Sequence, residues 1–119
     1  MKPQSWPLAL ALSLTALLMP ASNAAAAPTT PAAPSCTQGS ICFYTGSRFG
    51  GRSWEWVAKD GYHDMPAGFH DNVGSFVASA EGCFVNWDPK ETRVVHSGDN
   101  RIDYGSDFGG RIDGVGPGC

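Results

Sequence analysis

The chain has 119 residues, with 8 Lys and Arg against 11 Asp and Glu, which gives a formal net charge of −3. The basic residues are scattered along the chain rather than clustered, so we expect no nucleic-acid partner and no membrane partner. The length allows one domain after a targeting segment, and we expect a monomer.

Residues 1–26 have the features of a secretory signal peptide. Lys2 precedes an apolar run over residues 6–19, and small residues follow. This run is shorter than the ~20 apolar residues that a membrane-spanning helix needs. Cleavage after Ala24 or after Ala26 satisfies the small-x-small rule equally well. The sequence therefore predicts a secreted, extracellular protein.

Residues 27–35 are rich in Pro, Ala and Thr, and we predict a disordered leader there. Residues 36–119 then form one domain, with motif one over 36–80 and motif two over 81–119. A domain of this size buries only about 60–65% of the surface of its unfolded chain, so its core alone leaves a small margin of stability.

All four cysteines lie in the predicted domain, and none are spaced as Cys-x-x-Cys. Export leads to an oxidising compartment, so two disulfides are expected rather than a metal site. Four cysteines allow three pairings. We favour Cys36 with Cys42, which flank a Gly-Ser turn, and Cys83 with Cys119, which would tie down the last residue.

The first structural element is a hairpin folded back on itself over Phe43–Gly51. Two strand-forming residues precede a run of small residues, and an aromatic residue returns just before paired glycines. Phe49 can then lie against Tyr44, while Gly51 takes a backbone conformation that a Cβ would oppose.

The rest of the domain alternates between strand-like segments and turn residues. Strands are expected over residues 53–57, 73–78, 83–87 and 93–96, and residues 59–65 could hold a helical turn. Strand alternation places both tryptophans of the 53–57 segment on one face. These patterns predict an all-β domain.

An internal repeat determines the expected architecture. Cys42-Phe43 recurs as Cys83-Phe84, 41 residues on, and residues 69–75 match residues 108–114, 39 residues on. Two four-stranded units with one apolar face each would cover one another as a sandwich. The side chains expected in its interior are Trp54, Trp56, Phe76, Phe84, Trp87, Val94 and Ile112.

The spacing from Tyr44 to Gly51, the duplicated motif and the opening Cys36-Thr37-Gln38-Gly39-Ser40-Ile41-Cys42-Phe43-Tyr44 resemble secreted actinobacterial proteins of peptidase inhibitor family I36. The resemblance implies a beta-gamma crystallin-like sandwich of two Greek-key motifs. It also implies inhibition of an extracellular peptidase, since the best-studied member of the family inhibits thermolysin-type metalloproteinases. Such an inhibitor holds a stretch of backbone rigidly in the protease cleft, so that little entropy is lost on binding.

The inhibitory segment that the resemblance suggests is 82–86, in particular Cys83, Phe84 and Val85. Apolar residues after a disulfide-tethered cysteine would suit the hydrophobic subsite of a thermolysin-like enzyme. The alternative is a core strand that begins motif two. In the inhibitory pattern the second cysteine pair closes a short loop around the reactive bond, whereas Cys83 and Cys119 are far apart.

A second function class is a calcium-binding, structural or toxin-like extracellular module without inhibitory activity. Beta-gamma crystallins that bind cations have two Asp or Asn, two free positions and then Ser or Thr twice, and residues 71–76 match all but the last position. Asp71 and Ser75 would offer side-chain oxygens and Val73 a carbonyl, with Asn72 beside them. The alternative is that Asp71 and Asn72 stabilise a turn.

The second copy of this pattern, residues 110–115, has lost these groups. We therefore expect no required cofactor and at most one weakly bound calcium ion, with a dissociation constant on the order of 0.1–1 mM.

An enzyme is not expected. The histidines His63, His70 and His96 match no zinc motif, and no Gly-x-Ser-x-Gly elbow occurs. If both disulfides form, no free cysteine remains as a nucleophile.

Overall fold

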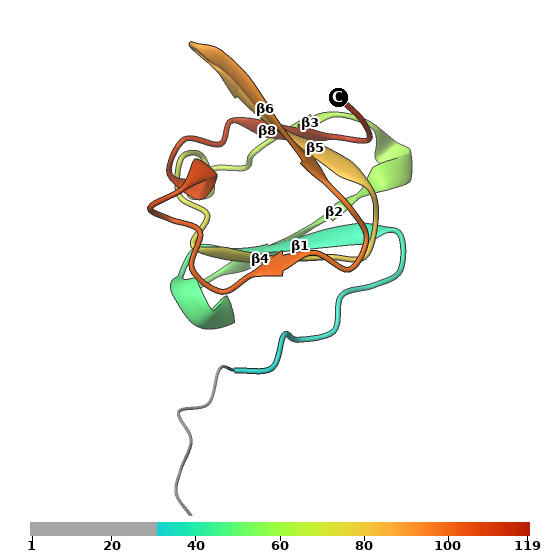
Figure 1. Ribbon diagram of the computed structural model, residues 1–119, viewed down its shortest axis with the longest axis vertical. Coiled ribbons are helices and arrows are strands. Elements are labelled where there is room, and N and C mark those ends of the chain that lie inside the picture. The colour runs from blue at the N-terminus through green and yellow to red at the C-terminus, as the bar shows by residue number, and fades with distance from the viewer. Residues whose placement is uncertain (1–30) are drawn as a thin grey trace, which may run out of the picture. The chain divides into compact units, whose positions relative to one another are not determined.

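The computed structural model describes residues 31–119, and the predicted signal peptide lies outside this range. Within residues 31–119 the chain forms two four-stranded antiparallel sheets that pack face to face (Figure 1). The prediction of an all-β sandwich is confirmed. None of the helical turns in this range is long and apolar enough to cross a membrane.

Eight strands and three short 3-10 turns make up the sandwich. The strands are β1 (Ser40–Tyr44), β2 (Ser53–Val57), β3 (His63–Asp64), β4 (Ser75–Ala78), β5 (Gly82–Trp87), β6 (Lys90–Val95), β7 (Asn100–Arg101) and β8 (Gly114–Gly116). The 3-10 turns are η1 (Ser47–Phe49), η2 (Ala58–Asp60) and η3 (Phe108–Gly110). The turn η2 overlaps the start of the helical turn expected over 59–65.

Each sheet contains one strand from the other motif. The order is β2-β1-β4-β7 in the first sheet and β3-β8-β5-β6 in the second. Strand β7 belongs to motif two but pairs with β4, and β3 belongs to motif one but pairs with β8. The sequence repeat predicted two units, but it did not reveal this exchange, which makes each sheet incomplete without the other motif.

The folded hairpin predicted for motif one is present between β1 and β2. The rings of Tyr44 and Phe49 meet edge to face with 5.8 Å between centroids, and Gly51 has a φ of +77°. A Cβ on Gly51 would lie 2.3 Å from the Thr45 hydroxyl oxygen, so a side chain would be excluded here even without the backbone strain.

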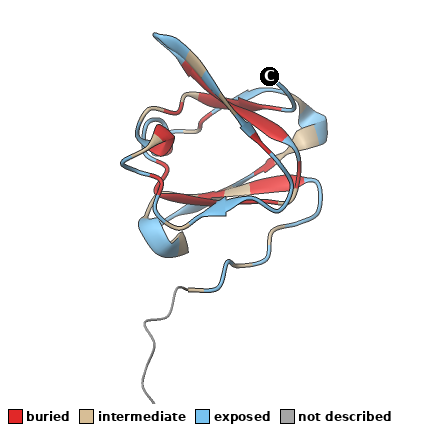
Figure 2. Cartoon of the chain, in the orientation of Figure 1, coloured by how far each residue is buried: buried red, intermediate tan, exposed pale blue. Residues whose placement is uncertain are grey.

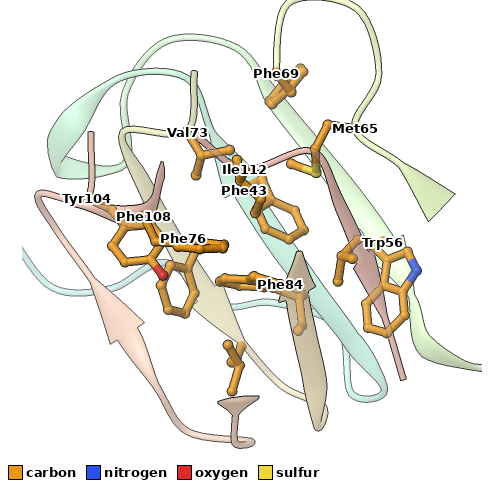
Figure 3. Close-up of a cluster of buried hydrophobic side chains, with 14 of the residues drawn as sticks. Phe43, Trp56, Met65, Phe69, Val73, Phe76, Phe84, Tyr104, Phe108 and Ile112 are labelled. Atoms are coloured by element: carbon orange, nitrogen blue, oxygen red, sulfur yellow. The ribbon is translucent and has the colours of Figure 1, made fainter. Parts of the chain in front are cut away.

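The core lies between the inner faces of the two sheets (Figure 2). Phe43 of β1 and Phe84 of β5, which are equivalent in the repeat, are both fully buried and meet at 5.3 Å between ring centroids (Figure 3). Of the residues expected in the interior, four are buried there: Trp56, Phe76, Phe84 and Ile112. Trp54 is partly buried and packs against the cluster.

Two residues expected in the interior are instead exposed: Trp87 is 49% exposed and Val94 is 62% exposed. Phe84 faces the core, so Trp87, three positions along the same strand, must face outward. Val94 pairs directly with Cys83, the neighbour of Phe84, and residues that pair directly share a face of the sheet. Apolar character alone did not show which face of this strand pair is covered.

Both disulfides connect as predicted, one between Cys36 and Cys42 and the other between Cys83 and Cys119. The first joins the segment before β1 to the middle of β1. The second joins the central strand β5 to the last residue of the chain. Each motif is therefore cross-linked once.

Candidate functional site

The segment expected to be inhibitory is a core strand. Strand β5 pairs on one side with β6 and on the other with β8. Cys83, Phe84 and Val85 are 1%, 0% and 6% exposed. A protease cleft cannot reach this backbone while the domain is folded, so the structure corrects the expected position of the inhibitory segment.

The outer face of the second sheet carries the exposed large apolar side chains of residues 31–119. Trp87 and Val94 lie on this face, for the reasons given above. Tyr62 lies across the same face, because a Cβ on Gly114 of β8 would meet its hydroxyl oxygen at 2.0 Å. Tyr62 is 44% exposed. We call Tyr62, Trp87 and Val94 the outer-face patch.

The two aromatic rings of this patch hold each other in place. Their centroids are 5.9 Å apart in an edge-to-face arrangement, and the Trp87 indole N–H donates to the Tyr62 hydroxyl oxygen (2.8 Å). That hydroxyl in turn donates to the Asp64 carboxylate (2.7 Å). Burial and the bond to Asp64 raise the pKa of Tyr62, so it stays protonated at neutral pH. The Lys90 ammonium lies 5.2 Å from the Trp87 ring centroid.

Strand β6, which carries Val94 of this patch, is an edge strand of the second sheet. It has β5 as its neighbour on one side, and no strand of residues 31–119 pairs with its other side. Its side chains alternate, and Lys90, Thr92 and Val94 are the exposed ones. Val94 is the direct partner of Cys83, so the Cys83–Cys119 disulfide braces the strand next to the exposed edge. The β5–β6 hairpin extends beyond the rest of its sheet (Figure 1).

The residues predicted to hold calcium do not all turn toward one point. Ser75 is fully buried, and its hydroxyl donates to the Gly46 carbonyl (2.7 Å) and accepts from the Phe49 N–H (2.9 Å). This hydroxyl holds the folded hairpin against β4. Asn72 donates its side-chain amide to a backbone carbonyl four residues earlier (2.9 Å) and so stabilises its own turn.

Asp71, also in the predicted calcium set, belongs to a different cluster. Its carboxylate lies with His70 and Asp113 in a group whose ligand atoms are all within 4.8 Å of one another. The His70 Nδ1 is 3.1 Å from Asp113 Oδ1, and the other Asp113 oxygen accepts from the Trp87 backbone N–H (2.7 Å). Sequence reasoning missed this group because Asp113 comes from the other motif and no local spacing relates it to His70.

The donor set of this cluster is two carboxylates and one imidazole. Calcium takes six to eight oxygen ligands, so water would have to supply most of the shell. Zinc takes imidazole nitrogen and carboxylate oxygen in fewer positions. The group therefore fits a weakly held cation, and its imidazole suits zinc better than calcium.

The remaining histidines sit apart from this cluster. His63 packs its ring on Trp54 at 5.2 Å between centroids. His96 Nδ1 lies 2.8 Å from a Glu81 carboxylate oxygen. The hydrogen bond from the Ser97 backbone N–H lowers the pKa of Glu81, and the hydrogen bond with His96 lowers it further. The same bond to Glu81 raises the pKa of His96. In residues 31–119 neither carboxylate-paired histidine contacts a serine hydroxyl or a thiol in the manner of a nucleophile and its base.

Comparison with known proteins agrees with this architecture. Residues 29–87 match the model of peptidase inhibitor family I36. The chain is 41% identical over 86 residues to an uncharacterized gerABC family protein of Dictyostelium discoideum, an alignment that covers 72% of this chain and 78% of the relative. It is 32% identical over 90 residues to spore germination protein 1 of the same organism, with 71% of each chain covered.

Solved structures of beta-gamma crystallin domains share the fold. One is the domain of Abundant Perithecial Protein from Neurospora crassa in its Ca2+-bound form, with a TM-score of 0.55, 18% identity, and 70% of this chain and 91% of that chain covered. Another is a beta-gamma crystallin from Ciona intestinalis, with a TM-score of 0.51, 22% identity, and coverage of 66% and 99%. The chain therefore belongs to peptidase inhibitor family I36 and has a beta-gamma crystallin-type fold.

Proposed function

We propose that this chain is a secreted, non-catalytic inhibitor of an extracellular peptidase, of the metalloproteinase type, and that strand β6 with the outer-face patch forms its contact surface. The observation that carries the proposal is an exposed edge strand braced by a disulfide: Val94 is 62% exposed and pairs directly with the disulfide-bonded Cys83. The family match supplies the class of partner.

An edge strand has the backbone geometry that a protease cleft accepts. Peptides bound by strand addition are extended and use main-chain hydrogen bonds for affinity and alternate side chains for specificity. Strand β6 offers a free edge and alternating exposed side chains. Among these, Val94 is apolar and suits a hydrophobic subsite.

The folded hairpin of motif one is a weaker candidate for the cleft. Arg48 and Phe49 at its tip have φ values of 57° and 60°, in the left-handed region. This backbone is tightly curved, whereas an extended strand is what adds to a sheet edge.

The aromatic pair beside β6 supplies anchoring area. Trp and Tyr dominate the binding energy of many protein interfaces, because they bury a large area with few rotatable bonds. Tyr62 and Trp87 are already fixed by their mutual hydrogen bond, so little side-chain entropy is lost when a partner covers them.

The direct test is a residual-activity titration of thermolysin, with subtilisin alongside, against the purified protein, followed by mass analysis. The expected result is stoichiometric loss of thermolysin activity, with the chain intact or cut once within residues 90–95. Full activity at large molar excess would rule out inhibition of both proteases.

Two variants separate the proposed surface from the rest of the domain. Val94→Asp adds a negative charge to the exposed edge of β6, and Ser53→Asp adds the same charge to the exposed edge of β2 in the other sheet. We expect Val94→Asp to weaken inhibition at least about tenfold, since a charge must then be desolvated at an apolar subsite, and Ser53→Asp to leave it unchanged. Equal effects would place the contact elsewhere.

Weak cation binding is a second proposal, and it is favoured by the cluster of His70, Asp71 and Asp113. A Ca2+-bound form is known for a beta-gamma crystallin domain of the same fold. Calcium is expected to raise the melting temperature only at millimolar concentration, and zinc at lower concentration because of the imidazole. Asp113→Asn should abolish both shifts, and Asp60→Asn, an exposed control, should not. A shift that Asp113→Asn leaves intact would place the ion at another site.

A further inference from the structure

A pocket of about 400 Å3 opens where the edge strand β6 of the second sheet approaches the edge strand β7 of the first. Its principal lining residues are Phe76, Arg93, Asn100, Arg101, Tyr104 and Asp107. The volume lies in the range of small-molecule sites. Figure 3 shows Phe76, Tyr104 and Phe108 together at this end of the core, with Trp56 at the other end.

The floor of the pocket contains a buried hydroxyl without a partner. Tyr104 is 5% exposed, and its ring packs on Phe76 with 5.0 Å between centroids. Its hydroxyl makes no hydrogen bond with residues 31–119. Burial raises the pKa of Tyr104 to about 12, so the hydroxyl remains a donor at neutral pH. No protein group of residues 31–119 satisfies this donor, so an acceptor that a ligand brings into the pocket can pair with it.

Two guanidinium groups lie over aromatic rings at the pocket. The Cζ of Arg101 is 4.9 Å from the Tyr104 ring centroid, and that of Arg93 is 4.7 Å from the Phe108 ring centroid. Arg101 already donates to Asp107 (3.1 Å) and to the Asp103 carbonyl (3.3 Å), and Arg93 donates to the Thr92 carbonyl (3.0 Å). A guanidinium has five N–H donors, so each group still has donors for a planar acceptor.

The two guanidinium groups that line the pocket differ in how closely they are paired. The lining contains two arginines, Arg93 and Arg101, and two aspartates, Asp99 and Asp107. Arg101 pairs with Asp107 at 3.1 Å, whereas the carboxylate paired with Arg93 is that of Glu91 at 3.9 Å, which Arg111 also holds at 2.8 Å. Arg93 is therefore the more loosely paired of the two and can take a further carboxylate.

We propose that this pocket binds a small organic monoanion with an apolar body, whose carboxylate accepts from the Tyr104 hydroxyl and from the guanidinium of Arg93 or Arg101. The ring of Phe76 provides the apolar contact. The Asp99 carboxylate, which is held at the rim by the His96 backbone N–H (2.8 Å), disfavours ligands with several negative charges. Arg93 and Val94 of β6 also line the pocket, so the site adjoins the proposed peptidase contact, and a small-molecule titration tests it without a peptidase.

Benzoate is a suitable probe, and benzamide has the same shape without the charge. In an amide-detected NMR titration of the purified protein, we expect saturable shifts with benzoate at Asn100, Arg101 and Tyr104, and at least about tenfold weaker binding of benzamide. Absence of saturable shifts, or equal binding of the two probes, would overturn the proposal.

Tyr104→Phe removes only the hydroxyl and should weaken benzoate binding about tenfold. It should leave the melting temperature unchanged or raise it, because the removed group has no partner in the folded chain. Arg101→Gln should also weaken binding about tenfold. The control is Lys59→Gln, which removes a positive charge from η2, a turn that does not line the pocket, and it should not weaken binding. If all three variants bind benzoate equally, the interaction is non-specific and the pocket is not its site.

Discussion

The two motifs of this domain share a repeat but use one equivalent position in opposite ways. In motif one the position is Ser75, whose buried hydroxyl ties the folded hairpin to β4. In motif two, 39 residues on, it is Gly114, and the space that a Cβ would fill holds the Tyr62 hydroxyl. Motif one thus folds its hairpin back onto itself, whereas motif two extends its β5–β6 hairpin outward. The same fold therefore has one end where the hairpin is closed and one sheet face that is exposed.

The largest expected effect tests whether the two motifs contribute equally to the core. Phe43→Ala and Phe84→Ala each remove a fully buried ring from equivalent positions, so each should lower the free energy of unfolding by about 3–5 kcal/mol. Urea denaturation measures both. Val94→Ala, on the exposed face, is the control and should cost less than about 0.5 kcal/mol. A large difference between the two phenylalanines would show that one motif dominates the core.

Removal of each disulfide compares the cross-links of the two motifs. The cysteines are separated by 36 positions in Cys83–Cys119 and by 6 in Cys36–Cys42. Loop-closure entropy then predicts losses of ~3.8 and ~2.4 kcal/mol for the paired Cys→Ala variants. Thermal and urea unfolding of the two double variants check this order. The reverse order would mean that strand contacts, rather than chain entropy, decide the contribution of each bridge.

Ser75→Ala tests the hydroxyl that distinguishes the motifs. It leaves the Gly46 carbonyl and the Phe49 N–H without their partner, and we expect a loss of about 1–3 kcal/mol. Hydrogen exchange at the Phe49 amide should become much faster. Ser79→Ala, which removes a hydroxyl that bonds to the Cys36 carbonyl, should leave that amide protected. Unchanged exchange in Ser75→Ala would show that the backbone alone closes the hairpin.

The smallest effect comes from the exposed pair of His96 and Glu81. The raised pKa of His96 means that its contribution is complete below its ordinary value of 6.5 and is lost as pH rises through its folded value. The lowered pKa of Glu81 means that its contribution is present above 4.5 and is lost as pH falls. The stability difference between wild type and His96→Asn should therefore be largest between pH 4.5 and 6.5.

Glu81→Gln should reproduce that pH profile, and 1 M salt should flatten it by screening. A difference that stays constant from pH 4 to pH 9, measured by thermal unfolding, would show that charge plays no part in the pair.

Local sequence patterns determined the features that depend on neighbouring residues. The edge-to-face contact of Tyr44 with Phe49 and the positive φ of Gly51 follow from the spacing of one hairpin, and the repeat at Phe43 and Phe84 predicted two covering faces. The cysteine pairing was predicted because one pair is close in sequence and the other pair then follows.

Only the tertiary structure decided which faces are covered and which polar groups meet. The exchange of β3 and β7, the exposure of Trp87 and Val94, the use of Ser75 by the hairpin and the placement of His70 beside Asp113 all depend on contacts between segments far apart in the chain. An alternating pattern shows that successive side chains point to opposite faces of a strand. It does not show which of these faces the other sheet covers. That depends on long-range pairing, because burial and hydrogen bonding are properties of the whole packed domain.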